Sequence, residues 1–195
     1  MDNQQSEISH QPSHVTIHMV ASLDGFIARR DGSVDWLETD DRYEAGESMS
    51  PEFIATFLQS IDCYVMGART YETALDFEAK GLGWAYGDTH TVVLTRRALK
   101  KTRENIEFYA GDLHTLFNQR LRPAYKSIWV AGGGAVAGDC LRLGLADEVS
   151  YSIVPVLIGD GISFFEGLDT DVALHLVSTK AFKNGMVELR YAVKR

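Results

Sequence analysis

The stretch "SIWVAGGGAVAG", residues 127–138, places three consecutive glycines between an apolar run and a second apolar segment. The run "SIWVA" predicts a buried strand, and "GAVAGDCLRLGLA" predicts a helix. A glycine turn that opens a helix presents bare backbone N–H groups and the positive end of the helix dipole, which together favour an anion. A tight turn alone could explain glycine here. Because three in succession exceed what a turn needs, we expect a ligand phosphate at this backbone.

The spacing of Gly132, Gly134 and Ala137 also satisfies the glycine pattern of Rossmann dinucleotide-binding units. Such a unit would place this turn after the first strand and continue in parallel βα units, whereas the residues that follow here read as mostly strand. The acidic residue expected about twenty positions later at a strand end is also missing, since Glu148 opens the next strand and Asp160 lies beyond it. The pattern therefore predicts a phosphate site without Rossmann topology.

Length and composition fit a single domain. The 195 residues, 45% of them hydrophobic, suffice for one core. We expect residues 1–13, which are polar and non-periodic, to form a disordered tail and residues 14–195 to form the domain. The net charge of −8 argues against nucleic acid as a partner, and no apolar run is long enough to span a bilayer.

Cys63 and Cys140 have no paired spacing, and the chain start lacks a secretory leader pattern, so we expect a cytoplasmic protein. His10, His14 and His18 would align on a helix, but Pro12 and the β-branched run argue against one there. We therefore predict no metal site.

The remaining patterns predict a mixed α/β fold. Ser50 and Pro51 begin a helix with an apolar face that should pack against another part of the chain, and Asp112 lies near the start of another helix. The predicted order is strand, helix, three strands, helix, strand, helix and three final strands, the last two joined by a turn at Lys183–Gly185. Crossovers followed by a hairpin imply a mixed sheet covered on both faces.

Two further strand ends carry ligand-binding residue types. The segment "GART" (67–70) and the segment "TRR" (95–97) each place cations and hydroxyls where a predicted strand stops. Ligands of open α/β sheets bind at the carboxyl ends of strands. With the glycine turn, these ends could bind a pyrophosphate and one more phosphate, which suggests NADP rather than NAD.

Five segments, "ASLDGFIA", "VMGARTYE", "VVLTRR", "WVAGGGAVAG" and "VPVLIGDGISFF", occur in an order that resembles the dihydrofolate reductase-like superfamily, specifically its riboflavin-biosynthesis reductase group (RibD C-terminal domain). The resemblance extends from Val15 to Val193. It implies a three-layer α-β-α fold with a mixed, mostly parallel eight-stranded sheet that ends in an antiparallel hairpin. It also implies NADPH as the cofactor, a small-molecule substrate and a homodimer.

The same resemblance implies roles for individual residues. Those expected to border the nicotinamide are Val20, Ala21 and Ile27. Those expected at the pyrophosphate are Gly67, Arg69, Thr70, Gly132, Gly133 and Gly134, with a cis Gly132–Gly133 peptide, and those expected at the 2'-phosphate are Thr95, Arg96 and Arg97. Two departures from the family pattern are Ala68, where an arginine is frequent, and Ala131, where riboflavin-type reductases commonly carry a glutamate.

Three residues are hypothesised to serve catalysis. Asp41, with Asp40 as a weaker choice, follows Trp36 at nearly the place where dihydrofolate reductases have their carboxylate, although a solvated acidic loop explains it as well. Asp24 shapes the turn beside the nicotinamide or acts on the substrate, and Ser152 lies where the family places a substrate-facing hydroxyl.

The resulting hypothesis is an NADPH-dependent oxidoreductase that transfers a hydride to a pterin- or pyrimidine-like C=N or C=O group, related to 5-amino-6-(5-phosphoribosylamino)uracil reductase. The alternatives are a genuine dihydrofolate reductase and a non-catalytic NADP(H)-binding protein. The glycine-rich "KGLGWAYGD" (80–88) is interpreted as a lid or an interface loop.

Overall fold

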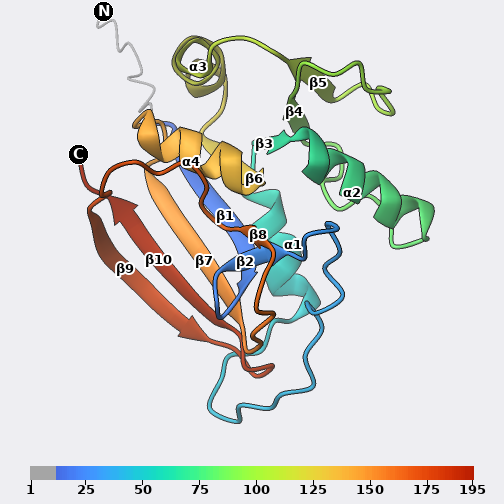
Figure 1. Cartoon of the computed structure of the whole chain (residues 1–195), viewed down its shortest axis with the longest axis vertical. Helices are drawn as coiled ribbons and strands as arrows, with labels where there is room; N and C mark the ends of the chain where they lie inside the picture. Colours follow the sequence, from blue (N-terminus) through green and yellow to red (C-terminus); the bar gives the residue numbers. More distant parts are fainter. Residues whose placement is uncertain (1–11) are drawn as a thin grey trace, which may run out of the picture.

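The structure is a computed structural model that describes residues 12–195, and it is built on one eight-stranded sheet (Figure 1). The strands follow the order β5-β4-β3-β6-β1-β7-β10-β9. Their bounds are β1 (His14–Ser22), β3 (Cys63–Gly67), β4 (His90–Leu94), β5 (Ile106–Tyr109), β6 (Ser127–Gly132), β7 (Glu148–Val154), β9 (Leu174–Ala181) and β10 (Val187–Val193). Most of the expected tail lies outside the described residues, and β1 begins at His14 as predicted.

The first six strands of this order, from β5 through β4, β3, β6 and β1 to β7, are parallel to one another. Strand β10 is antiparallel to both of its neighbours, β7 and β9. Register pairs such as Val20 with Ser152 join β1 to β7, and β10 then runs back along β7 with Glu188 opposite Ser152. Gly185, with φ +77°, makes the turn between β9 and β10. The predicted mixed sheet with a terminal antiparallel hairpin is therefore confirmed. A second, two-stranded sheet pairs β2 (Phe26–Ala28) with β8 (Ile162–Ser163).

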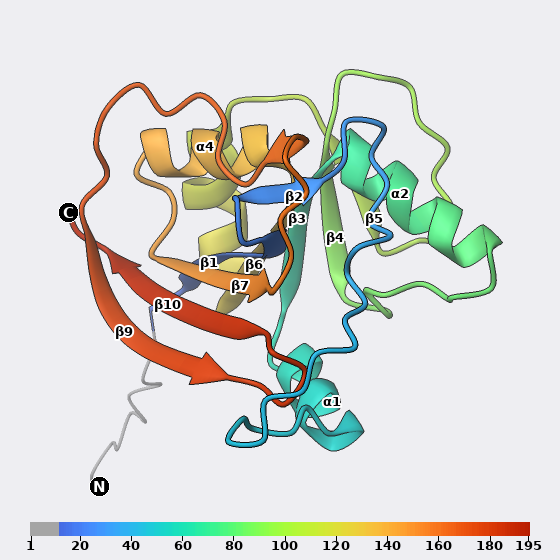
Figure 2. The ribbon, with the colours of Figure 1, turned by 60° about the horizontal axis from the view of Figure 1, so that its bottom comes forward.

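Helices cover both faces of the sheet (Figure 2). One face carries α1 (Pro51–Gln59) and α2 (Ala68–Ala79), and the other carries η1 (Thr115–Leu121), α3 (Arg122–Ala124) and α4 (Gly134–Arg142). The strands separate these layers because successive side chains point to opposite faces. On β3, for example, Val65 packs with the α4 side, whereas Tyr64 and Met66 pack with Tyr71 of α2.

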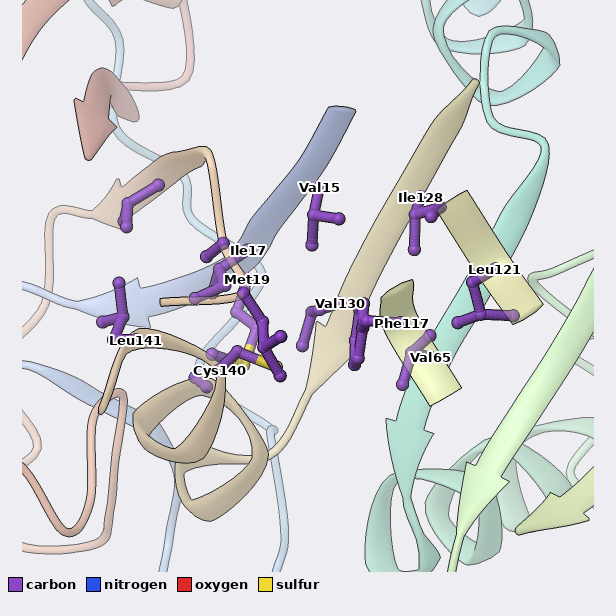
Figure 3. Close-up of a cluster of buried hydrophobic side chains, with 14 of the residues drawn as sticks. Val15, Ile17, Met19, Val65, Phe117, Leu121, Ile128, Val130, Cys140 and Leu141 are labelled. Carbon is purple, nitrogen blue, oxygen red and sulfur yellow. The ribbon is translucent and has the colours of Figure 1, made fainter. Parts of the chain in front are cut away.

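The main core lies between the sheet and α4 (Figure 3). Val15 and Ile17 of β1 and Val130 of β6 are fully buried there beside Cys140 of α4. Burial raises the pKa of Cys140 to about 12, so its thiol is a buried apolar group and not a nucleophile at neutral pH. This core fixes β1, β6 and α4 relative to one another, and so fixes the glycine turn that connects the last two.

Two features of the helices differ from the sequence predictions. Helix α2 is missing from the predicted order because it buries only Tyr71 and Ala74, too little for a clear apolar period. Helix α1 begins at the predicted Ser50 cap, whose hydroxyl accepts from Phe53 N at 3.2 Å. None of its nine residues, all of them described, is buried. Leu58 packs against the smaller core and Phe57 packs against the rings of His18 and Trp129. The helix therefore packs on the sheet as predicted, but its apolar side stays more exposed than the pattern suggests.

Candidate active site

The glycine turn joins β6 to α4 at the carboxyl edge of the sheet. The peptide between Gly132 and Gly133 is cis, as the resemblance implies. Gly133 is the N-cap of α4, and within the described chain no side chain bonds to the first N–H groups of this helix. These donors have no intrahelical partner, so they are free to bind an anion.

The three glycines are needed for different reasons. A Cβ on Gly134 would overlap the backbone carbonyl oxygen of Ser163, so the chain itself excludes a side chain there. A Cβ on Gly132, which has φ +155°, would lie 2.7 Å from Thr70 Oγ1. A Cβ on Gly133 would have Thr70 Oγ1 at 3.9 Å as its nearest neighbour, which is ordinary contact. Gly133 is therefore the position at which space is left for a ligand.

Helix α2 brings a second N-terminus to the same place. Its N-cap is Gly67, and the described residues again provide no side-chain cap. Thr70, in its first turn, lies directly against Gly132. Two helix N-termini with free N–H groups thus flank one glycine turn, and their dipoles add at this edge.

The expected cations lie beside this edge, on and after the neighbouring strands. Arg69 and Arg96 are exposed and form no ion pair with any of residues 12–195, whereas Arg97 donates to Glu72 Oε2 at 2.9 Å. Thr95 Oγ1 accepts from Arg97 N at 2.9 Å and shapes the turn after β4. Arg69 and Arg96 are therefore the cations free to bind phosphate, and Arg97 would first have to leave Glu72.

The residues expected around a nicotinamide lie on the other side of the glycine turn. Val20 and Ala21 are near the end of β1, which is the neighbour of β6, and Ile27 of β2 packs against the main core. Ser22 Oγ accepts from Phe26 N at 3.1 Å and joins β1 to β2. The end of β1 therefore lies beside the glycine turn, with Val20 on the α1 face of the sheet and the fully buried Ala21 on the α4 face.

Asp24 holds a loop in place. Its carboxylate accepts from Gly159 N at 2.7 Å and from Ile158 N at 3.2 Å. A hydrogen bond from the Ser22 side chain, then these two N–H groups, lower the pKa of Asp24. This geometry agrees with the turn-shaping interpretation of Asp24.

Asp41 is exposed, as is Asp40. Its carboxylate lies so close to the β9–β10 turn that a Cβ on Gly185 would overlap it, and Pro155 lies at the same place. Exposure to solvent is not typical of a general acid, so the catalytic role of Asp41 stays a hypothesis.

Ser152 belongs to a cluster that sequence reasoning missed. Its side chain is buried on β7, and its Oγ is 3.0 Å from His18 Nε2 on β1. The imidazole stacks on Trp129 of β6 with ring centres 4.8 Å apart. Burial, assisted by the charge of Arg190, lowers the pKa of His18 to about 4. The one sequence signal for this cluster was the alternation of side chains along a strand, which puts His18 on the same face as Val20.

The loop at 80–88 is packed in this structure. Trp84 stands edge-to-face on Tyr71, and Tyr86 stands edge-to-face on Tyr64, with ring centres 6.0 and 4.9 Å apart. Arg103 lies over Trp84 at 4.5 Å. The loop therefore extends the smaller core on the α2 side.

Two cavities open elsewhere. One of about 420 Å³ lies between α4 and the segment 165–174, and one of about 300 Å³ is lined by Ser48, Met49 and residues 182–184. Neither includes the glycine turn, so the site at this turn rests on the backbone donors and cations above. Residues 12–195 contain no group of three side chains suited to a metal ion. Every helix in that range is too short or too polar to cross a bilayer.

Comparison with known proteins agrees with this geometry. The chain is 32% identical over 176 residues to the uncharacterized protein YwjB of Bacillus subtilis, covering 90% of this chain and 95% of that protein. It is 25% identical to the riboflavin biosynthesis protein RibD of Corynebacterium ammoniagenes, over 77% of this chain and 45% of RibD. A candidate riboflavin biosynthesis protein from Shewanella sp. PV-4 superposes with a TM-score of 0.76 at 22% identity, covering 94% of this chain and 99% of that one. The family model of the RibD C-terminal domain matches residues 72–188. The chain therefore belongs to the RibD C-terminal domain family, which has the dihydrofolate reductase-like fold.

Proposed function

We propose that this chain is an NADPH-dependent reductase that adds hydride to a C=N or C=O bond of a small planar heterocycle. The observation that carries the proposal is the pair of helix N-termini, of α2 and α4, that open on either side of Gly133. Membership of a family related to riboflavin-pathway reductases supports the same reaction class.

The residues at this edge fit the two ends of NADPH. The free N–H groups at Gly133 and at the start of α2 would bind the pyrophosphate, with Arg69 beside them. Arg96, which is unpaired within residues 12–195, would bind the 2'-phosphate. Because Ala68 stands where the family often has an arginine, only Arg69 and the backbone N–H groups would bind the pyrophosphate here. NADPH would supply the hydride.

The chain's own contribution is to position the nicotinamide against the substrate ring and to exclude water from between them. Val20 would border the nicotinamide on the α1 face of β1, where Ser152 of β7 lies directly opposite it in register. Ala21 is fully buried on the α4 face, where Ile27 packs, and would offer the cofactor only its backbone. A substrate ring in front of Ser152 would therefore lie next to Val20. Fixed proximity of this kind supplies much of the rate in hydride transfer.

The cofactor assignment is tested by the Arg96→Ala variant. Because a charged hydrogen bond to phosphate contributes about 1.5–3 kcal/mol, NADPH affinity should fall about 10- to 100-fold while NADH affinity stays the same. Calorimetric titration of both cofactors measures this. The control is Arg142→Ala, which removes the same charge at the far end of α4, where Arg142 pairs only with Asp139. Equal affinity of Arg96→Ala and wild type for NADPH would contradict the assignment.

The reaction class is tested by NADPH oxidation with pterins, pyrimidines and dihydrofolate. Oxidation with a pyrimidine or pterin would support the proposal. Turnover confined to dihydrofolate would identify a dihydrofolate reductase. NADPH binding without oxidation by any of these rings would favour the non-catalytic alternative.

A further inference from the structure

Three side chains from adjacent strands meet on the sheet face beneath α1: His18, Ser152 and Glu188, here called the His18 cluster. Ser152 is directly opposite both Val20 and Glu188 in register, whereas His18 is opposite Ser150. The His18 imidazole nevertheless reaches Ser152, so it leans toward the carboxyl end of β1. The cluster thus lies level with Val20, on the face of the sheet opposite the buried Ala21.

The chemistry of the cluster is unusual for the interior of a fold. Glu188 is largely buried, with 18% of its side chain exposed, and its carboxylate is 3.9 Å from His18 Nε2. Since His18 is neutral at pH 7, this contact is not an ion pair. Within residues 12–195 no hydrogen bond satisfies the Glu188 carboxylate, although Ser152 and His18 satisfy each other. The Glu188 carboxylate is therefore an acceptor without a protein donor in that range, and it is open to the N–H donors of a ligand.

Neighbouring charges are engaged elsewhere. Arg190, two residues along β10, donates two hydrogen bonds to Glu148 Oε1 at 2.8 and 3.0 Å. Lys180, opposite Glu188 on β9, lies 4.0 Å from Glu47 and over the ring of Phe53. Neither cation forms an ion pair with Glu188.

Aromatic rings flank the cluster. Phe57 of α1 is edge-on to His18 at 5.5 Å and to Trp129 at 5.3 Å, and Phe53 stands near Phe182. Phe53, Ile54 and Phe57 remain 38–45% exposed although they lie on the apolar side of α1. Half-exposed rings above a polar floor suit a flat ligand with a polar edge.

We propose that Glu188 and Ser152 bind the N–H-bearing edge of the substrate ring, and that His18 is a positioning residue that holds the Ser152 hydroxyl. This inference rests on the proposed reductase function and specifies its substrate. The ring carries adjacent N–H donors and no anionic group at that edge. Glu188, from the last strand, thereby takes the carboxylate role that sequence reasoning gave to Asp41.

The experiment uses the full chain saturated with NADPH and titrated calorimetrically with 2,4-diaminopyrimidine, which has N–H donors along its edge. The matched probe 2,4-dimethoxypyrimidine has the same ring without them. We expect only the first probe to bind wild type and Glu188→Gln to weaken it at least tenfold. Ser152→Ala should weaken it as well, and Ser152→Thr, which keeps the hydroxyl, should restore it. His18→Phe should weaken it more than His18→Gln, which keeps a side-chain donor.

NADPH affinity, measured in the same samples, shows whether each variant is folded. It also separates the proposed reductase function from the proposed role of the His18 cluster in binding the substrate. Glu104→Gln, at a fully exposed carboxylate, is the matched control. Failure of wild type to bind NADPH would overturn the proposed function, and titration of the probes without NADPH would then still test the cluster. Intact NADPH binding with equal affinity of Glu188→Gln and wild type for diaminopyrimidine would overturn the inference alone. Loss of probe binding in Asp41→Asn but not in Glu188→Gln would return the carboxylate role to Asp41.

Discussion

Each of the three glycines at the end of β6 meets a different neighbour. Gly134 is required by the chain itself, because the carbonyl of Ser163 occupies the place of its Cβ. Gly132 is required by its positive φ and by Thr70. A Cβ on Gly133 would meet Thr70 Oγ1 only at an ordinary contact distance of 3.9 Å, and Gly133 caps α4. Of the three glycines, only Gly133 therefore remains as a position where a ligand, and not the chain itself, would exclude a side chain.

This difference predicts opposite results for two alanine variants. Gly134→Ala should lower the free energy of unfolding by about 1–3 kcal/mol, the usual cost of overpacking, since its methyl group meets rigid backbone. Gly133→Ala should leave stability nearly unchanged and weaken NADPH binding, because the methyl group enters the space left for the ligand. Urea unfolding and calorimetric titration measure both effects. Wild-type NADPH affinity in a folded Gly133→Ala protein would contradict this account.

At the scale of elements, β1, β7 and β10 are joined by an ionic network around the buried Glu148. Arg190 and His14 both face Glu148, whose side chain is 8% exposed. Burial acts to raise the pKa of Glu148, but the nearby His14 and the hydrogen bonds from Arg190 outweigh it, so the pKa is lowered. The pKa of His14 is raised, chiefly by the Glu148 carboxylate 3.8 Å away. The network ties the terminal hairpin to the parallel part of the sheet.

The signs of these shifts predict how stability depends on pH. Glu148 stabilises the fold above its ordinary pKa of about 4.3, and this is lost as pH falls through its lowered value. His14 stabilises it below about 6.5, and this is lost as pH rises through its raised value. Glu148→Gln should therefore lower the free energy of unfolding most near pH 5 to 6, by about 1–3 kcal/mol. The loss should be smaller than for a fully buried ion pair because 42% of the Arg190 side chain is exposed.

Urea unfolding of wild type and Glu148→Gln from pH 3 to 9 measures this dependence. Glu104→Gln, at a fully exposed carboxylate, is the control and should change stability little at any pH. A Glu148→Gln effect that is the same at pH 3 and pH 6 would contradict the network's role.

The sequence predicted the eight strands of the main sheet, the hairpin and α4, because apolar runs and glycine turns are local signals, but it missed the short β2 and β8. The apolar period alone missed α2, which buries only Tyr71 and Ala74, whereas the family resemblance implies a helix that starts at Arg69 and Thr70. Sequence reasoning also missed the His18 cluster, since Ser152 is 134 positions from His18 and only the sheet register brings them together. Pattern alone could not reveal that α1 buries none of its residues or that Asp41 is exposed. These facts depend on tertiary packing.

At the scale of the whole molecule, both helix layers supply the site. Helix α2 comes from one face of the sheet and α4 from the other, and their N-termini meet at the edge where β3 and β6 end (Figure 2). The outer strand β9 exposes Leu176 and Val177, each 50% accessible, on opposite faces. A homodimer and a cytoplasmic location stay predictions.

The central claim is that NADPH binds where these two helices begin. It is tested most directly by amide NMR shifts of the uniformly ¹⁵N-labelled protein during titration with NADPH. We predict saturable shifts of the amides of Gly133, Gly134, Arg69 and Thr70, with none at the distant Lys126, which precedes β6. Shifts confined to other parts of the chain, or no saturable shift at all, would contradict the account.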